Sequence, residues 1–182
     1  SPAVFNREKL EWYNKQYMMQ IDLDEVTKRA IPFFINAGVV DKTQVDGLEE
    51  FEYLKKVVDL ERTRANTLVE LVDSVGFIFA KDLVYDASLL VWKKSTKEDA
   101  KEKLIGLKVL LGSISESGWE LASIEQVVKE WITKNECGVG NTLWPLRVAL
   151  SGQKNSPGPF DLVYVLGKEK VLKRISAAID MM

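Results

Sequence analysis

Apolar residues recur every three or four positions along nearly the whole chain, and this spacing constrains the fold more than any other feature of the sequence. Residues 6–19, for example, carry Leu10, Tyr13 and Tyr17 at such spacings among charged side chains. The same pattern predicts further helices over residues 22–36, 48–60, 62–72, 95–111, 123–137, 143–150, 156–166 and after Gly167. With about nine helices and no convincing strand, the predicted fold class is all-α.

Short motifs indicate where several of these helices begin. A polar residue followed three positions later by an acid or an amide forms a capping box. The sequence offers Asp22 with Glu25, Ser95 with Glu98, and Ser123 with Gln126. Ser156 and Pro157 form the favoured N-cap and first-residue pair of another helix. Pro32 predicts a kink or an early stop in its helix, and Gly76 predicts an interruption before Phe77.

The helices are expected to form two subdomains. Residues 82–86 look like a connection, so we expect one helical subdomain over residues 1–82 and another over residues 83–182. An α-solenoid-like stacking of helix pairs is the alternative arrangement, although the sequence shows no fixed-period repeat.

Composition excludes several kinds of chemistry. The sequence contains no histidine and one cysteine, Cys137, so Ser-His-Asp triads, zinc sites built from His or Cys, and internal disulfides are impossible within it. The glycine patterns of Walker and dinucleotide-binding loops are also missing. No apolar run is long enough for a membrane span and no signal-peptide pattern is present, so we expect a cytoplasmic protein. Because the chain starts with Ser1 rather than Met, we expect an excised or processed piece.

The net charge of −2 argues against a general polycationic coat for nucleic acid, so RNA binding would need a local patch. Residues 143–169 offer one, because Arg147 on a predicted helix is followed by a polar loop and the helix start at Ser156. A helix N-terminus presents N–H groups to phosphates or base edges, and arginine adds a planar set of donors. The supporting basic patch consists of Lys154, Lys168, Lys170, Lys173 and Arg174. The alternative interpretation is a solvated basic face on a helical protein-interaction scaffold with no RNA role.

The residues of this segment resemble the C-terminal signature of bacterial-type glutamyl-tRNA synthetases, which belong to class I. The matching residues are Pro145-Leu146-Arg147, Leu150-Ser151-Gly152, Ser156-Pro157 and Leu166-Gly167-Lys168-Glu169. The start of the chain adds a second match to the segment that follows the ATP-binding signature loop of that family. It consists of Ser1-Pro2-Ala3-Val4-Phe5-Asn6, Lys9-Leu10, Trp12 and Asn14. The resemblance implies a helical cage in two parts, in which residues 1–82 link to an absent catalytic and stem-contact region and residues 83–182 complete the anticodon site.

The resemblance also implies which residues contact a tRNA anticodon. Carried over by position, Arg64 matches an arginine that reads the third anticodon base. Arg147 and the loop residues Ser156, Pro157 and Pro159 match residues that contact anticodon bases. The family often has Leu where this chain has Pro159, so the shape of that contact is expected to differ.

Among the five tryptophans, Trp144 is the best candidate for stacking on a base, because it lies one helical turn before Arg147. The others are mostly expected in the core.

The implied role of Arg64 is chemically reasonable. Glutamate and glutamine tRNAs differ at the third anticodon base, where the first has C and the second has G. Arginine has only donors, which match the O2 and N3 acceptors of C and oppose the N–H donors of G. The alternative for Arg64 is a helix-surface ion pair with Glu61 or Glu70.

Catalysis in this family depends on a His-containing motif and a Lys-Ser loop, and neither occurs in this sequence. The expected function is therefore anticodon recognition without catalysis and without a cofactor in this chain. The parent enzyme would be a glutamate–tRNA ligase that uses ATP and Mg²⁺. The expected partner is tRNA(Glu), with no DNA and no membrane, and the chain is expected to be a monomer.

Overall fold

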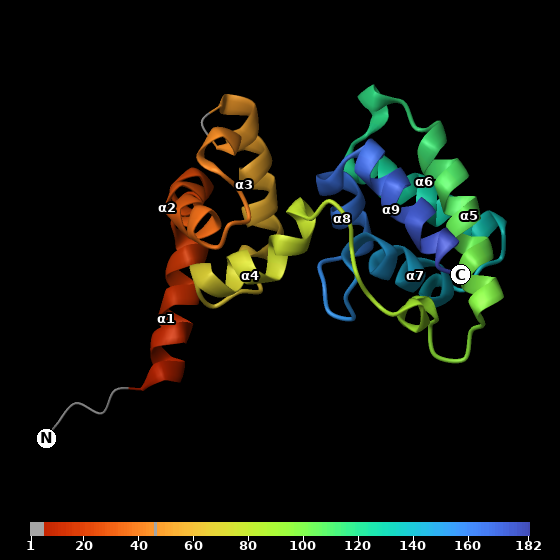
Figure 1. Ribbon diagram of the computed structural model, residues 1–182, viewed down its shortest axis with the longest axis horizontal. Coiled ribbons are helices and arrows are strands. Elements are labelled where there is room, and N and C mark those ends of the chain that lie inside the picture. The colour runs from red at the N-terminus through yellow and green to blue at the C-terminus, as the bar shows by residue number, and fades with distance from the viewer. Residues whose placement is uncertain (1–5, 46) are drawn as a thin grey trace, which may run out of the picture. The chain divides into compact units, whose positions relative to one another are not determined.

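The computed structural model describes residues 6–45 and 47–182, apart from the side chain of Gln44. Within these residues it contains nine α-helices, three short 3-10 helices and no strand, which confirms the all-α class (Figure 1). The chain divides into two compact units, residues 1–80 and 81–182, which we call unit 1 and unit 2. The functions expected for residues 1–82 and 83–182 stay predictions. The first five residues of the N-terminal motif, Ser1 to Phe5, lie outside the described residues.

The described part of unit 1 contains α1 (Arg7–Gln20), α2 (Leu23–Asn36), η1 (Lys42–Gln44), α3 (Leu48–Arg62) and α4 (Leu68–Phe79). Its core lies where α2, α3 and α4 pack together, and Phe34, Leu54 and Leu71 are among the fully buried side chains there. Asp22 caps α2 by accepting a hydrogen bond from the amide of Asp24. Pro32 does not end this helix, which continues to Asn36.

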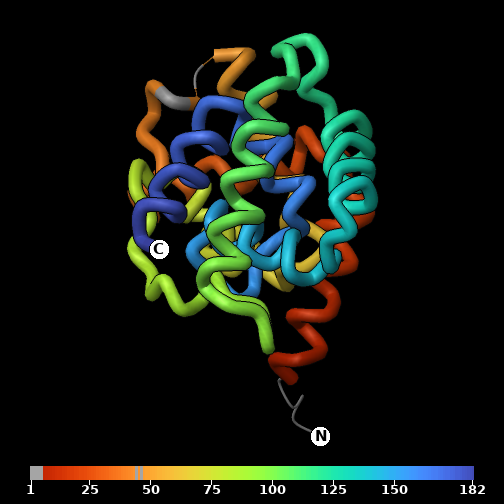
Figure 2. The backbone as a smooth tube through the Cα atoms, turned by 90° about the vertical axis from the view of Figure 1, so that its right-hand side faces the viewer, coloured from red at the N-terminus to blue at the C-terminus, as the bar shows by residue number. Residues whose placement is uncertain are grey.

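The described part of unit 2 contains η2 (Ala87–Leu90), α5 (Lys97–Ser113), η3 (Glu116–Gly118), α6 (Leu121–Lys134), α7 (Val139–Ser151), α8 (Pro159–Leu166) and α9 (Lys168–Asp180). Helix α5 contacts α6, α7 and α9, and Figure 2 shows it with α6 on one side and α9 on the other. The side of α5 that carries Leu104, Leu107 and Leu111 is fully buried, as their helical spacing predicts. This face of α5 organises the core of unit 2.

The start of α4 differs from the prediction. Residues 63–67 form a connection, and the helix begins at Leu68 because Thr67 caps it, accepting a 3.1 Å hydrogen bond from the amide of Glu70. Gly76 lies inside α4 and does not interrupt it. The neighbouring Phe77 and Ile78 are buried, and their packing outweighs the weak helix propensity of one glycine.

Two other helix starts also differ from their predicted positions. The N-cap of α5 is Thr96, which accepts from the amide of Asp99 at 3.1 Å, while the hydroxyl of Ser95 donates to the Asp99 carboxylate. The predicted cap of α6, Ser123, lies inside that helix, whose N-cap position is taken by Glu120. In both cases the capping-box pattern correctly predicted a helix start in the region, but it predicted the wrong residue at the N-cap position.

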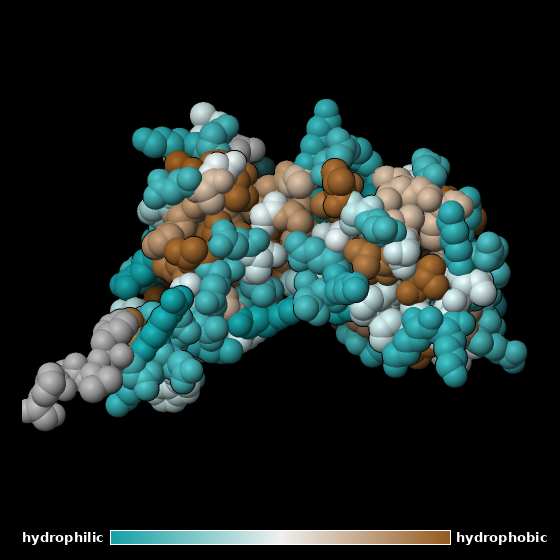
Figure 3. Space-filling model, turned by 60° about the horizontal axis from the view of Figure 1, so that its bottom comes forward, coloured by the Kyte–Doolittle hydropathy of each residue, from teal (hydrophilic) through white to brown (hydrophobic). Residues whose placement is uncertain are grey.

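The surface of the described residues mixes hydrophilic and apolar side chains. On the face drawn in Figure 3, hydrophilic residues predominate and small apolar patches lie among them. The exposed aromatic residues of α1 are Trp12, Tyr13 and Tyr17. None of the described helices is both long and apolar enough to cross a membrane.

Truncation of Leu104 tests the packing of α5. Leu104→Ala should lower the free energy of unfolding by about 2–5 kcal/mol, because it removes apolar contacts and leaves a cavity. Val109→Ala is the control, since Val109 lies on the same helix but is 71% exposed, and it should change the stability by less than about 0.5 kcal/mol. Urea unfolding followed by tryptophan fluorescence measures both, because Trp92, Trp119, Trp131 and Trp144 all lie in unit 2. Equal losses in the two variants would contradict this packing.

Candidate functional site

Arg64 lies in the connection between α3 and α4, within unit 1. The amides of Arg64 and Ala65 donate to the carbonyl of Glu61 at 2.8 and 3.0 Å, which fixes the connection to the end of α3. On the other side, the amide of Asn66 donates to the carboxylate of Glu70 in α4 at 2.8 Å. Ala65 is itself buried. The backbone around Arg64 is not helical, but hydrogen bonds to residues of α3 and α4 fix it at both sides.

The Arg64 side chain is 44% exposed and lies beside a buried acid. Its Nε atom is 3.6 Å from Oε1 of Glu61, whose side chain is 8% exposed. Burial raises the pKa of the Glu61 carboxyl above its ordinary value, and the charge of Arg64 and the hydroxyl of Ser74 partly oppose this rise. Of the two acids that the sequence offered as ion-pair partners, Glu61 is the one that pairs with Arg64.

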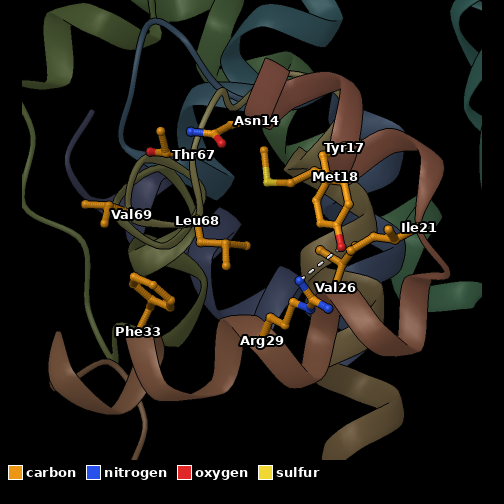
Figure 4. Close-up of a pocket in the computed structure, with 10 residues that line it drawn as sticks. All are labelled: Asn14, Tyr17, Met18, Ile21, Val26, Arg29, Phe33, Thr67, Leu68 and Val69. Atoms are coloured by element: carbon orange, nitrogen blue, oxygen red, sulfur yellow. Dashed lines mark hydrogen bonds between the residues drawn. The ribbon is translucent and has the colours of Figure 1, made fainter. Parts of the chain in front are cut away.

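A mostly apolar pocket of about 270 Å³ lies beside the start of α4 (Figure 4). It is lined by Asn14, Tyr17, Met18 and Ile21, by Val26, Arg29 and Phe33, and by Thr67, Leu68 and Val69. A guanidinium nitrogen of Arg29 donates to the hydroxyl of Tyr17 at 3.3 Å. None of the residues predicted to contact RNA lines this pocket, so it lies outside the candidate site.

Arg147, in α7 of unit 2, is oriented by two kinds of contact. Its Nη2 donates to the carbonyl of Lys154 at 2.8 Å, and its guanidinium lies 4.7 Å from the centroid of the Trp144 ring. Trp144 is anchored in turn, because its Nε1 donates to the carbonyl of Leu89 at 2.7 Å and its ring centroid lies 4.5 Å from that of Trp92. An aromatic pair and the loop after α7 thus hold Arg147 in place.

The contacts of Trp144 suggest support for Arg147, whereas the sequence suggested stacking on a base. Trp144 is only partly exposed, and its role in stacking stays a prediction. The sequence reasoning missed Trp92, which packs so closely on α7 that a Cβ atom at Gly140 would clash with its indole ring. The available signal was this glycine, because glycine is disfavoured inside a helix unless close packing requires it.

The loop before α8 is packed differently from the prediction. The N-cap of α8 is Gly158 and its first residue is Pro159, so Ser156 and Pro157 do not begin the helix. The fixed φ of proline suits the first helical position, and its missing N–H has no helical partner there. Ser156 is 6% exposed, its hydroxyl donates to the Pro157 carbonyl at 3.3 Å, and Pro157 is also buried. The contacts of Ser156, Pro157 and Pro159 with bases stay predictions.

Three residues determine where this loop leaves α7. Gly152 ends the helix with a left-handed φ of 69°, and its amide donates to the carbonyl of Val148 at 2.7 Å. A Cβ atom at this position would lie 3.1 Å from Cδ1 of Tyr85. Arg174, which is 5% exposed, donates to the carbonyl of Leu150 at 2.5 Å. The expectation that Arg174 belongs to a basic patch is therefore corrected, because its guanidinium is buried and donates to a carbonyl at the end of α7.

The three patch lysines on α9 surround a hollow of about 540 Å³ near the start of that helix. It is lined by Lys81, Glu116, Leu166, Gly167, Lys168, Glu169, Lys170 and Lys173. The ammonium of Lys168 donates to the carbonyl of Ile114 at 2.6 Å. Burial lowers the pKa of Lys170, and the positive charges of Arg174 and Lys173 lower it further. Positive charge is thus concentrated locally in a chain of nearly balanced charge.

No group of three or more His, Cys, Asp or Glu residues in the described chain is arranged to hold a metal ion.

A family model described as "Anticodon binding domain" matches residues 25–179. The glutamate–tRNA ligase of Clostridium botulinum is 35% identical over 186 aligned residues, which cover 100% of this chain and 36% of the relative. That of Flavobacterium psychrophilum is 32% identical over 177 residues, covering 97% and 33%.

A solved structure of a glutamate tRNA ligase from Elizabethkingia meningosepticum matches the fold with a TM-score of 0.78 at 22% sequence identity. The match covers 97% of this chain and 32% of that one. The chain therefore belongs to the anticodon-binding domain family. Its resemblance to glutamyl-tRNA synthetases, indicated by the two sequence motifs, is confirmed by these relatives. The chain spans 33% and 36% of the length of the two curated relatives.

Tyr85 gives unit 2 a measurable dependence on alkaline pH. Burial raises the pKa of Tyr85 to about 12 in the folded chain, whereas an unfolded tyrosine ionises near about 10. The stability that the neutral phenol contributes is present below about pH 10 and is lost as the pH rises through 12. Ultraviolet titration of the wild type and of Tyr85→Phe should differ by one tyrosine that ionises near pH 12. A difference centred near the ordinary tyrosine value would contradict this burial.

Proposed function

We propose that this chain recognises a tRNA anticodon, as the anticodon-binding part of a glutamate–tRNA ligase that attaches glutamate to tRNA(Glu). The observation that carries the proposal is the family match over residues 25–179, which includes both Arg64 and Arg147. Relatives named glutamate–tRNA ligase align with the whole chain, which supports the choice of this enzyme.

The two arginines provide suitable chemistry for unpaired bases. Single-stranded RNA loops are bound by stacking and by hydrogen bonds to base edges. Arg147 combines a planar guanidinium with an aromatic support, and Arg64 exposes part of its side chain on a fixed turn. The two residues belong to different units, and their convergence with the Ser156 loop on one surface stays a prediction.

Catalysis is assigned to the remainder of the longer protein. ATP and Mg²⁺ would bind there, and this chain would act as a non-catalytic, monomeric module in the cytoplasm. Its role would be to contribute affinity for tRNA and to distinguish one anticodon from another.

Arg147→Ala tests RNA binding. Loss of a stacked, multi-donor contact should weaken the affinity of the chain for a tRNA(Glu) anticodon stem-loop about tenfold, which corresponds to about 1.4 kcal/mol. Lys134→Ala is the control, because Lys134 is exposed at the end of α6 and outside the candidate site, and it should change the affinity by less than about twofold. Filter binding or fluorescence anisotropy at several salt concentrations measures both. Weak binding that is equal for any RNA and for all variants would favour a protein-interaction scaffold.

Arg64→Gln tests anticodon discrimination. Two stem-loops that differ only in C or G at the third anticodon base should bind wild type with a preference for C. The variant should lose about 5- to 150-fold of that preference, because one bidentate contact discriminates by about 1–3 kcal/mol. Glutamine offers both a donor and an acceptor, so it no longer opposes the donors of G. An unchanged ratio of the two affinities would exclude this role for Arg64.

A further inference from the structure

Glu61 is the one buried carboxylate in the part of the chain that the structure describes, with 6% exposure. It lies in the last turn of α3, where the helix dipole presents partial negative charge. Both burial and this position disfavour an anionic side chain. The groups that offset this cost are the charge of Arg64 and the hydroxyl of Ser74, so the ionised state of Glu61 depends on Arg64.

The carboxylate of Glu61 uses its two oxygen atoms incompletely. Its Oε1 lies 3.6 Å from Nε of Arg64, which is longer than a hydrogen bond. Its Oε2 is buried without a hydrogen-bond partner among the described residues, because the nearby Ser74 hydroxyl donates to the carbonyl of Leu71. The carbonyl of the same residue meanwhile accepts from the amide of Arg64 at 2.8 Å. Glu61 thus fixes the backbone of Arg64 and also places a buried charge beside its guanidinium.

We propose that Glu61 is a positioning residue for Arg64, holding its guanidinium by the Nε edge so that the other donors point outward to the third anticodon base. This inference rests on the proposed anticodon recognition by Arg64. Arginine and carboxylate groups form two parallel hydrogen bonds of about 2.8 Å when both oxygens are used. In such a fork the 3.6 Å separation between Nε and Oε1 would shorten to that distance, and an Nη–H group of Arg64 would donate to Oε2.

Such a fork would make the guanidinium selective for one base. A guanidinium has five N–H donors, and two of them would be directed to Glu61 in the fork arrangement. The remaining three are available to the O2 and N3 acceptors of C. An arginine without this constraint is able to rotate toward the O6 acceptor of G, which lowers its selectivity. A fixed guanidinium is therefore required for discrimination more than for affinity.

Glu61→Gln tests the proposal, because it keeps the size of the side chain and removes one acceptor oxygen and the charge. Affinities of the full chain are measured for the two stem-loops that carry C or G at the third anticodon base. The preference for C should fall about fivefold in Glu61→Gln, the size of one ordinary hydrogen bond, because the amide retains one acceptor oxygen. Arg64→Gln and the double variant complete a cycle, in which the second change should have little further effect. Glu52→Gln is the matched control, because Glu52 is exposed on the same helix, and it should leave the preference unchanged.

The outcomes separate this inference from the proposed function. If Arg64→Gln leaves the preference unchanged, Arg64 does not recognise the base and the proposed role of Arg64 is itself wrong. If Arg64→Gln lowers the preference while Glu61→Gln retains it, the inference alone is overturned. Equal weakening of both RNAs by Glu61→Gln would indicate a structural role only, and would overturn it too.

A spectroscopic measurement without RNA gives an independent readout. In nitrogen-15 NMR spectra, the Nε–H signal of Arg64, identified by its loss in Arg64→Gln, should be protected from exchange with water in the wild type. Glu61→Ala, which leaves no acceptor oxygen, should remove this protection while the backbone amide signals of α3 and α4 stay in place. Retention of the protection in a folded Glu61→Ala variant would exclude the proposed contact.

Discussion

Every α-helix leaves four N–H groups and four carbonyl groups at its ends without helical partners, and an all-helical chain must satisfy them at each connection. Several cationic side chains of the candidate site donate hydrogen bonds to carbonyl groups at the ends of helices or in the loops that follow them. Lys168 donates to Ile114 at the end of α5, and Arg174 donates to Leu150 at the end of α7. Arg147 donates to Lys154 in the loop that follows α7. Lys168 and Arg174, which the sequence places in one basic patch, therefore both stabilise helix ends, and for the buried Arg174 this role replaces the expected exposure.

The two arginines with proposed base contacts are held by different forces. Arg147 rests on an aromatic ring that is braced by a second tryptophan, so packing orients it. Arg64 lies beside a buried carboxylate, so charge orients it. The pH acts on the second arrangement more than on the first, because the stacking of Arg147 on Trp144 does not depend on the ionisation of an acid. The position of Arg147 in unit 2 thus depends on Trp144, and the position of Arg64 in unit 1 depends on Glu61.

The sequence was sufficient for the fold class because helical spacing extends over entire segments, as in Leu104, Leu107 and Leu111. It was less reliable at helix ends, where neighbouring polar residues compete for one role. Thr96 rather than Ser95 caps α5, and only the relative placement of backbone and side chain decides between them. The contacts that support the candidate site were beyond prediction from spacing alone. Trp92 and Trp144, for instance, are 52 positions apart and meet only because η2 packs on α7.

The stacking of Arg147 on Trp144 has an entropic consequence. A free arginine side chain samples many rotamers, and fixing it costs roughly 2 kcal/mol. In this chain much of that freedom is already lost before any ligand arrives, since the Lys154 carbonyl and the indole ring restrain the guanidinium from two sides. The ordering cost is thereby transferred from binding to folding. A domain of this kind tends to meet its partner as a preformed surface, in which little of the interaction energy is spent on arranging the side chain.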